Sequence, residues 1–132
     1  MNFEKLVFVD LETTGANPTV DRITEIGLIE VDTSGKATRW SSLVNPEIPI
    51  PAFIQSLTGI SNDMVRNAPS FDQLAPALHE RLQGALFIAH NARFDYGFLR
   101  NEFTEAGYAF RAEVLCTVKL SRKLYPQENR HS

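Results

Sequence analysis

Phe8-Val9-Asp10-Leu11-Glu12-Thr13-Thr14-Gly15 lies close to the start of the chain. Its first two residues end an apolar run that begins at Leu6. Leu6 to Val9 are all apolar, a pattern that predicts a strand buried on both faces of a sheet. Asp10 and Glu12 stand two residues apart where this strand is expected to end. Neighbouring carboxylates repel each other unless a cation lies between them. The stretch therefore predicts a metal site at one end of a strand.

The composition is that of an ordinary soluble globular protein of one domain, residues 1–132, with 43% hydrophobic and 22% charged residues. No apolar run approaches the roughly 20 residues that a membrane helix needs, and the amino terminus lacks the pattern of a secretory signal. Cys116 is the single cysteine, which excludes an intrachain disulfide and fits a cytoplasmic protein. The net charge of −3 argues against a broad basic surface for nucleic acid, but not against a site that holds phosphate through metal ions.

Hydrophobic periodicity and turn residues predict an alternation of strands and helices. Strands are expected at residues 6–9, 23–31, 37–44, 85–89 and 114–116. Short helical pieces are expected within 52–64, broken at Thr58-Gly59, and a helix over 71–82 with a capping box of Ser70 and Gln73. A further helix is expected from the segment after His90 to Gly107. The last is expected to begin at a Thr117 cap and to end near Tyr125-Pro126. This order predicts an α/β fold, in which a mixed sheet of three antiparallel strands followed by parallel strands carries helices on both faces.

A second cluster, His90-Asn91-Ala92-Arg93-Phe94-Asp95, begins where the strand over 85–89 is expected to end. Asp95 would lie in the first turn of the next helix and, if that strand neighbours the first, would approach Asp10 and Glu12. Three converging carboxylates suit Mg²⁺ or Mn²⁺, and two such ions about 4 Å apart serve phosphoryl transfer. Each group also has a plainer interpretation: the first pair as a turn or helix cap, and Asp95 as a charge that interacts with the helix dipole.

The two clusters resemble the first two motifs of the DEDD superfamily of 3′–5′ exonucleases. The segments Arg22-Ile23-Thr24-Glu25-Ile26-Gly27 and Leu57-Thr58-Gly59-Ile60-Ser61 also resemble the branch related to the epsilon proofreading subunit of bacterial DNA polymerase III. The resemblance covers nearly the whole chain. It implies a ribonuclease-H-like fold, which agrees with the order of elements predicted above.

The resemblance implies that Asp10, Glu12 and Asp95 are catalytic residues that ligate two divalent ions, Mg²⁺ or Mn²⁺. Asp10 would bridge both ions, Glu12 would complete the site on the substrate side, and Asp95 would hold an ion directly or through water.

The resemblance also implies contacts to the terminal nucleotide. Backbone groups from Leu11 to Thr13 would contact it, Leu57 and Thr58 would pack near its base or sugar, and Phe94 or Phe98 would form a wall of the pocket. For Leu57 and the two phenylalanines, packing in the hydrophobic core is an equal alternative.

The family has a third motif, a histidine five residues before a fourth aspartate, in which the histidine is the general base. The chain ends at His131-Ser132 before any such motif. His79 is expected to be a solvated or edge residue, His90 a structural one, and His131 resembles a histidine that the family carries upstream of the third motif. Residues 1–132 are therefore expected to be the amino-terminal part of one exonuclease domain, with little hydrolysis, weak metal binding and an incompletely covered sheet.

The resemblance implies an enzyme that removes nucleoside 5′-monophosphates from single-stranded or frayed nucleic-acid 3′ ends, in proofreading or repair. DNA is favoured because the resemblance is to the proofreading branch, although the carboxylates themselves do not discriminate between the two sugars. The implied partners are a DNA polymerase subunit or a fused carboxyl-terminal domain. Two alternatives stay open: an RNA-trimming exonuclease of the same superfamily, and a non-catalytic module that binds a polymerase or nucleic acid.

Overall fold

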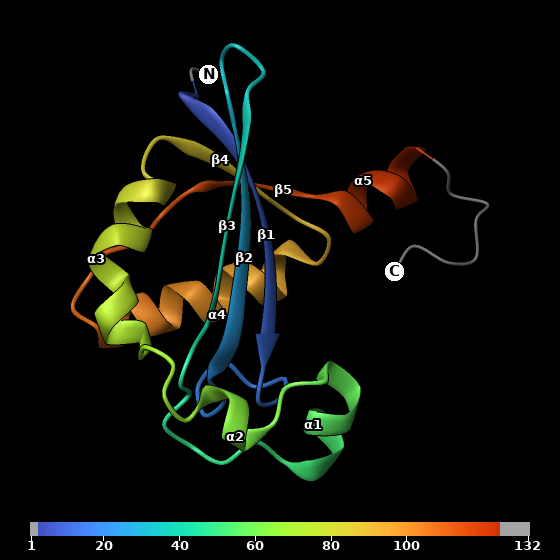
Figure 1. Ribbon diagram of the computed structural model, residues 1–132. Helices are drawn as coiled ribbons and strands as arrows, with labels where there is room; N and C mark the ends of the chain where they lie inside the picture. The colour runs from blue at the N-terminus through green and yellow to red at the C-terminus, as the bar shows by residue number, and fades with distance from the viewer. Residues whose placement is uncertain (1–2, 125–132) are drawn as a thin grey trace.

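The computed structural model describes residues 3–124, and within them one mixed sheet contains five strands (Figure 1). These are β1 (Lys5–Thr13), β2 (Ile23–Asp32), β3 (Ala37–Leu43), β4 (Ala85–Ala89) and β5 (Glu113–Cys116). Their order across the sheet is β3-β2-β1-β4-β5. The first three strands are antiparallel neighbours, whereas β4 runs parallel to β1 and β5 parallel to β4. The predicted meander followed by parallel strands is confirmed.

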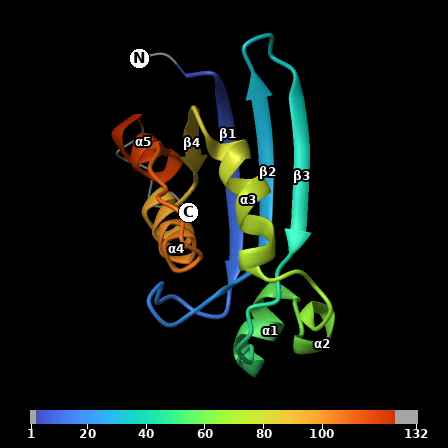
Figure 2. The same ribbon diagram turned by 90° about the vertical axis from the view of Figure 1, so that its left-hand side faces the viewer.

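The helices of the described residues are α1 (Ala52–Thr58), α2 (Asn62–Val65), α3 (Phe71–Leu82), α4 (Ala92–Glu105) and α5 (Thr117–Leu124). Both α1 and α2 lie beyond the carboxyl end of β1, past the ends of the strands (Figures 1 and 2). Gly59 ends α1 in the left-handed conformation, with φ of 76°, so the predicted break between these two short helices is confirmed.

The hydrophobic core lies between α3, α4 and one face of the sheet. Val7, Val9 and Leu11 of β1 point into it, because alternate residues of a strand share a face. Phe71 of α3 and Phe103 of α4 meet edge to face in this core, with 5.0 Å between ring centroids. Full burial of each such side chain contributes roughly 1.5–3 kcal/mol, so the contact helps to hold α4 against α3.

Two helix ends follow the predicted chemistry and one does not. Ser70 and Gln73 form the predicted capping box of α3, and Gly107 follows α4 with a left-handed φ of 89°. Thr117 was expected to cap α5, but it is the first residue of that helix, and its hydroxyl is hydrogen-bonded to Nδ1 of His90 at 2.8 Å. The expected end of this helix at Tyr125-Pro126 lies outside the described residues.

The first strand extends beyond its apolar run. It pairs with β2 from Lys5 to Thr13, whereas its pairing with β4 reaches only Phe8. The prediction that the strand ends before Asp10 is therefore wrong: Asp10 and Glu12 lie inside β1, not in a loop. Pairing with β2 holds this part of the strand extended, and the early end of β4 leaves one of its edges uncovered.

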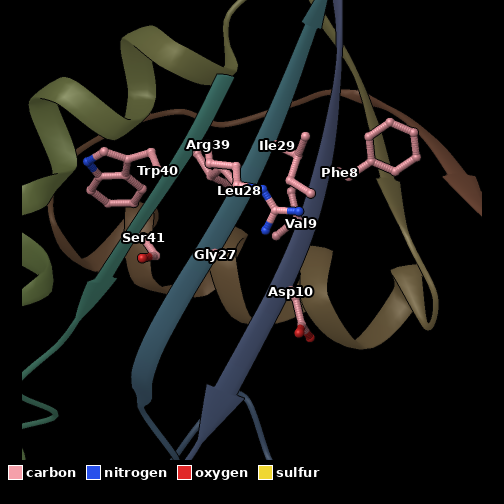
Figure 3. A pocket seen from close by; sticks show the side chains of 9 residues that line it. All are labelled: Phe8, Val9, Asp10, Gly27, Leu28, Ile29, Arg39, Trp40 and Ser41. Atoms are coloured by element: carbon pink, nitrogen blue, oxygen red, sulfur yellow. The ribbon is translucent and has the colours of Figure 1, made fainter. Parts of the chain in front are cut away.

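The second face of the sheet is only partly covered. Phe8 is 40% exposed there, so the prediction that β1 is buried on both faces is wrong. The helix α5 lies on the opposite side of the sheet from α3 (Figure 1). A hollow of about 350 Å³ remains on this open face, and the Arg39 side chain crosses β2 within it toward β1 (Figure 3). None of the helices in residues 3–124 combines the length and the apolar character needed to cross a bilayer.

Candidate active site

Asp10 and Glu12 share one face of β1 because they stand two residues apart on a strand. This is the open face of the sheet, where Asp10 is exposed and lines the hollow shown in Figure 3. Gly27 is the β2 residue paired with Asp10, so the position of β2 directly opposite that carboxylate carries no side chain. Glu25 is paired with Glu12 and adds a further negative charge.

Asp95 approaches β1 from the first turn of α4 and is only 7% exposed. Because β4 pairs with β1 no further than Phe8, the backbone N–H of Leu11 is available to donate to the Asp95 carboxylate. Burial, followed by the negative charge of Asp10, raises the pKa of Asp95 to about 7. Hydrogen bonds from its own N–H and that of Leu11 act in the opposite direction but do not cancel the effect.

The three carboxylates form one electrostatic cluster. Burial, then the charges of Asp10 and Glu25, raise the pKa of Glu12, and both Asp10 and Glu12 raise the pKa of Asp95. In residues 3–124, no three His, Cys, Asp or Glu side chains already stand close enough to hold a metal ion. Their mutual repulsion opposes closer approach, and a divalent cation would relieve it. A donor set of carboxylate oxygens fits Mg²⁺ or Mn²⁺, and metal ligation by these residues stays a prediction.

An ion pair between the buried Glu102 and the half-buried Arg22 holds α4 against the start of β2. Glu102 is 2% exposed and accepts hydrogen bonds from Nε of Arg22 at 2.8 Å and from the N–H of Ile23 at 2.9 Å. Asn101 also donates to the carbonyl of Pro18 at 2.6 Å. Because Glu102 lies about two helical turns after Asp95, these bonds help to set where α4 places that carboxylate. The partners are 80 residues apart, so sequence reasoning had no local signal for the pair.

The residues predicted to contact the nucleotide through α1 are accessible. Leu57 is 70% exposed, so the alternative that it packs in the core is wrong. Thr58 is half-buried, and its hydroxyl donates to the carbonyl of Ile54 at 2.8 Å, within the same helix. Leu11 and Thr13 have buried side chains, which leaves their backbone groups as the atoms able to meet a substrate.

The two phenylalanines of α4 differ in exposure. Phe98 has no exposed surface and packs against Phe94 with 4.8 Å between ring centroids, so core packing describes Phe98. Phe94 is half-buried. Phe94 lines a hollow of about 290 Å³ together with Pro18 of the loop before β2.

The histidines of the described residues lie away from the carboxylates or are engaged elsewhere. His79 was expected to be a solvated or edge residue, and it is half-buried: its Nε2 is within hydrogen-bonding distance of the Ala109 carbonyl, at 2.8 Å, and its ring packs on Phe103 and Tyr108. His90 is exposed and bonded to Thr117, in keeping with a structural role. His131 lies outside the described residues.

The sequence pattern of a known exonuclease family, RNase_T, matches residues 7–132. The chain belongs to the RNase_T exonuclease family. Similar curated proteins include the 3′–5′ exonuclease DinG of Bacillus subtilis (strain 168), 43% identical over 128 residues, and the PolC-type DNA polymerase III of Caldanaerobacter subterraneus subsp. tengcongensis, 39% identical over 121 residues. These matches cover 96% and 92% of this RNase_T chain, but it spans only 14% and 9% of the length of those relatives.

Solved structures show the same fold for this RNase_T chain. The product-bound structure of exonuclease I gives a TM-score of 0.83 at 19% identity, over 98% of this chain and 34% of that chain. Escherichia coli exonuclease I in complex with a dT13 oligonucleotide gives 0.82 at 19% identity, over 96% and 31%. The predicted ribonuclease-H-like fold and the predicted exonuclease family are both confirmed.

Proposed function

We propose that the protein is a metal-dependent 3′–5′ exonuclease that hydrolyses phosphodiester bonds at DNA 3′ ends and releases nucleoside 5′-monophosphates. One observation carries the proposal: Asp10 and Glu12 on the open face of β1 share an electrostatic cluster with the buried Asp95 of α4. An uncompensated cluster of this kind is costly as a structural feature. It is expected where bound cations and phosphate form part of the working site.

The chain's own groups divide the work by position. Asp10 is exposed in the hollow and would ligate both ions, while Glu12 would lie on the substrate side. Asp95 would complete the site from the first turn of α4. Two bound Mg²⁺ or Mn²⁺ ions would supply an activated water and neutralise charge on the leaving oxygen.

The terminal nucleotide would be positioned by atoms near this cluster. Backbone groups from Leu11 to Thr13 lie on the same strand as Asp10, and Leu57 with Thr58 lies on α1 beyond the end of that strand (Figure 1). We assign no role as general base to His79 or His90, because both are hydrogen-bonded to other parts of the fold.

DNA is the proposed substrate because two similar proteins are named as a DNA polymerase III and a 3′–5′ exonuclease. One further solved structure of this fold contains a DNA oligonucleotide. We also propose that the chain works in the cytoplasm with a DNA polymerase subunit or a fused carboxyl-terminal domain, since a PolC-type polymerase contains a similar segment within a much longer chain.

The decisive experiment measures hydrolysis of a 5′-labelled single-stranded DNA by the full-length protein with Mg²⁺. Asp10→Ala is expected to lower the rate at least about 100-fold, because loss of a metal-ion contribution costs several kcal/mol. Asp63→Ala, which removes an exposed carboxylate on α2, serves as the matched control and should retain activity. Equal rates for Asp10→Ala and the wild type would remove the metal-site assignment. An RNA oligomer of the same sequence tests the preference for the sugar. Faster hydrolysis of RNA than of DNA would mean that RNA is the substrate.

A further inference from the structure

Three hollows follow one another along α4. The first lies between α4 and the start of β5 and is lined by Tyr96, Arg100, Arg111, Ala112 and Glu113. The second shares Tyr96 with it and is lined also by Arg93, Leu115, Lys119 and Lys123. The third shares Arg93 with the second and includes Phe94 and Pro18. We call the first two hollows together the α4–β5 groove.

The groove is rich in positive charge. Five cationic side chains line it, namely Arg93, Arg100, Arg111, Lys119 and Lys123, against one acidic side chain, Glu113. All five are exposed, and among the described residues none of them forms an ion pair. The chain as a whole carries a net charge of −3, so this concentration is not a consequence of overall composition.

The floor of the groove is aromatic and apolar. Tyr96 lines both hollows and is held by ring contacts to Phe87 and Phe110, with centroids 5.9 and 5.5 Å away. Val114 and Leu115 of β5 are partly exposed beside it. A cationic groove with an aromatic floor is the arrangement that binds single-stranded nucleic acid, since the cations follow the phosphates and the bases stack.

The groove reaches the first turn of α4, the helix that also carries Asp95. Arg93 is the cationic residue at this end of the groove, and it stands two residues before Asp95, so the two side chains leave α4 on different sides. We propose that the α4–β5 groove binds the phosphodiester backbone of the single strand whose 3′ end enters the carboxylate site. The orientation of the bound nucleic acid, with its 3′ end at the carboxylates, rests on the proposed function. Binding of nucleic acid in the groove does not.

Binding is tested with the full-length protein and a 5′-fluorescein 15-nucleotide single-stranded DNA in EDTA, by anisotropy across a salt series. Arg100→Glu/Arg111→Glu is expected to weaken binding at least tenfold at 50 mM salt. Each lost phosphate contact should lower the slope of log affinity against log salt by about 0.7. Lys119→Glu/Lys123→Glu is a second pair with the same expectation, which keeps the test open if the first pair fails to fold.

The matched control is Lys36→Glu/Arg66→Glu, which changes the net charge equally at exposed positions outside the groove. An equal loss of affinity in this control, or no loss in either groove pair, would overturn the proposal. Competition by a polyglutamate peptide at the affinity of the oligonucleotide would also overturn it, because the groove would then fit an acidic protein segment. The measurement in EDTA requires no hydrolysis, so its failure is distinguishable from failure of the exonuclease assignment, which Asp10→Ala tests.

Discussion

Asp95 is the residue whose ionisation should be visible in the stability of the metal-free protein. Its pKa of about 7 in the folded state exceeds the value near 3.9 of an unfolded chain. The folded state therefore binds more protons between these two values, and stability falls as pH rises through this range. At about 1.4 kcal/mol per pKa unit, the loss from pH 5 to pH 7 attributable to Asp95 is expected to be about 2–3 kcal/mol.

The measurement is urea unfolding in EDTA at pH 5, 6, 7 and 8. Asp95→Asn should remove most of the fall in the free energy of unfolding, because an amide has no charge to bury. Asp63→Asn, at an exposed carboxylate, is the control and should keep the wild-type profile. An unchanged profile for Asp95→Asn would mean that another group titrates.

Glu102 should be important for stability although it is not a candidate ligand. Its carboxylate is buried and accepts hydrogen bonds from Arg22 and from the N–H of Ile23. Its removal leaves the N–H of Ile23 without an acceptor and the half-buried Arg22 without its partner, at a cost of about 2–4 kcal/mol. Glu102→Ala is expected to lower the free energy of unfolding by that amount in urea. Glu105→Ala, at an exposed position one turn further along α4, should change it by less than about 0.5 kcal/mol, and a similar cost in both variants would contradict this account.

The sequence pointed to the candidate metal ligands but not to the buried Glu102. Asp10, Glu12 and Asp95 were predicted as metal ligands because each belongs to a short motif beside an apolar strand. Glu102 carries no such motif, and its partner Arg22 is 80 residues away. Its role depends on how α4 packs against β2, which only the assembled fold determines.

At the level of elements, the start of α3 offers a clean test of local structure. The N–H of Gln73 donates to Oγ of Ser70 at 3.3 Å, and the N–H of Ser70 donates to Oε1 of Gln73 at 3.0 Å. Ser70→Ala is expected to lower the free energy of unfolding by about 1 kcal/mol, the usual cost of a lost cap. Ser56→Ala inside α1, where alanine is the better helix former, should be neutral or slightly stabilising. Equal effects of the two changes in thermal unfolding would show that the cap contributes nothing.

The length of β1 is the clearest error of sequence reasoning at this scale. The continuous apolar run from Leu6 to Val9 indicated a strand buried on both faces that stops before Asp10. A second pattern overlapped it, since Val9, Leu11 and Thr13 alternate with Asp10 and Glu12. That period of two residues is typical of a strand with one polar face. The alternation was the signal that both carboxylates lie within the strand.

For the whole molecule, the order of the strands could be predicted from the sequence. Which faces of the sheet the helices cover could be predicted only in part. Right-handed crossovers and short connections predict that β4 lies parallel to β1. Local sequence cannot tell which elements cover each face, because Phe8 has the same apolar character as the buried Val7 and Val9. The open face around Asp10 is therefore a property of the assembled chain, and it is where the proposed metal ions would have access.

Metal binding should reverse the order of thermal stability between the wild type and Asp10→Asn. In EDTA, Asp10→Asn is expected to be more stable than the wild type, because it removes a charge that raises the pKa of both Glu12 and Asp95. In Mg²⁺ at ten times its Kd, the wild type gains about 1.4 kcal/mol, or roughly 5 °C in Tm, whereas Asp10→Asn gains little. Thermal unfolding with and without Mg²⁺, at equal ionic strength, measures this crossover. Asp63→Asn should follow the wild type, because its carboxylate lies outside the cluster. If Mg²⁺ stabilised Asp10→Asn as much as the wild type, the ion would be binding elsewhere, and the carboxylates of β1 would need another explanation.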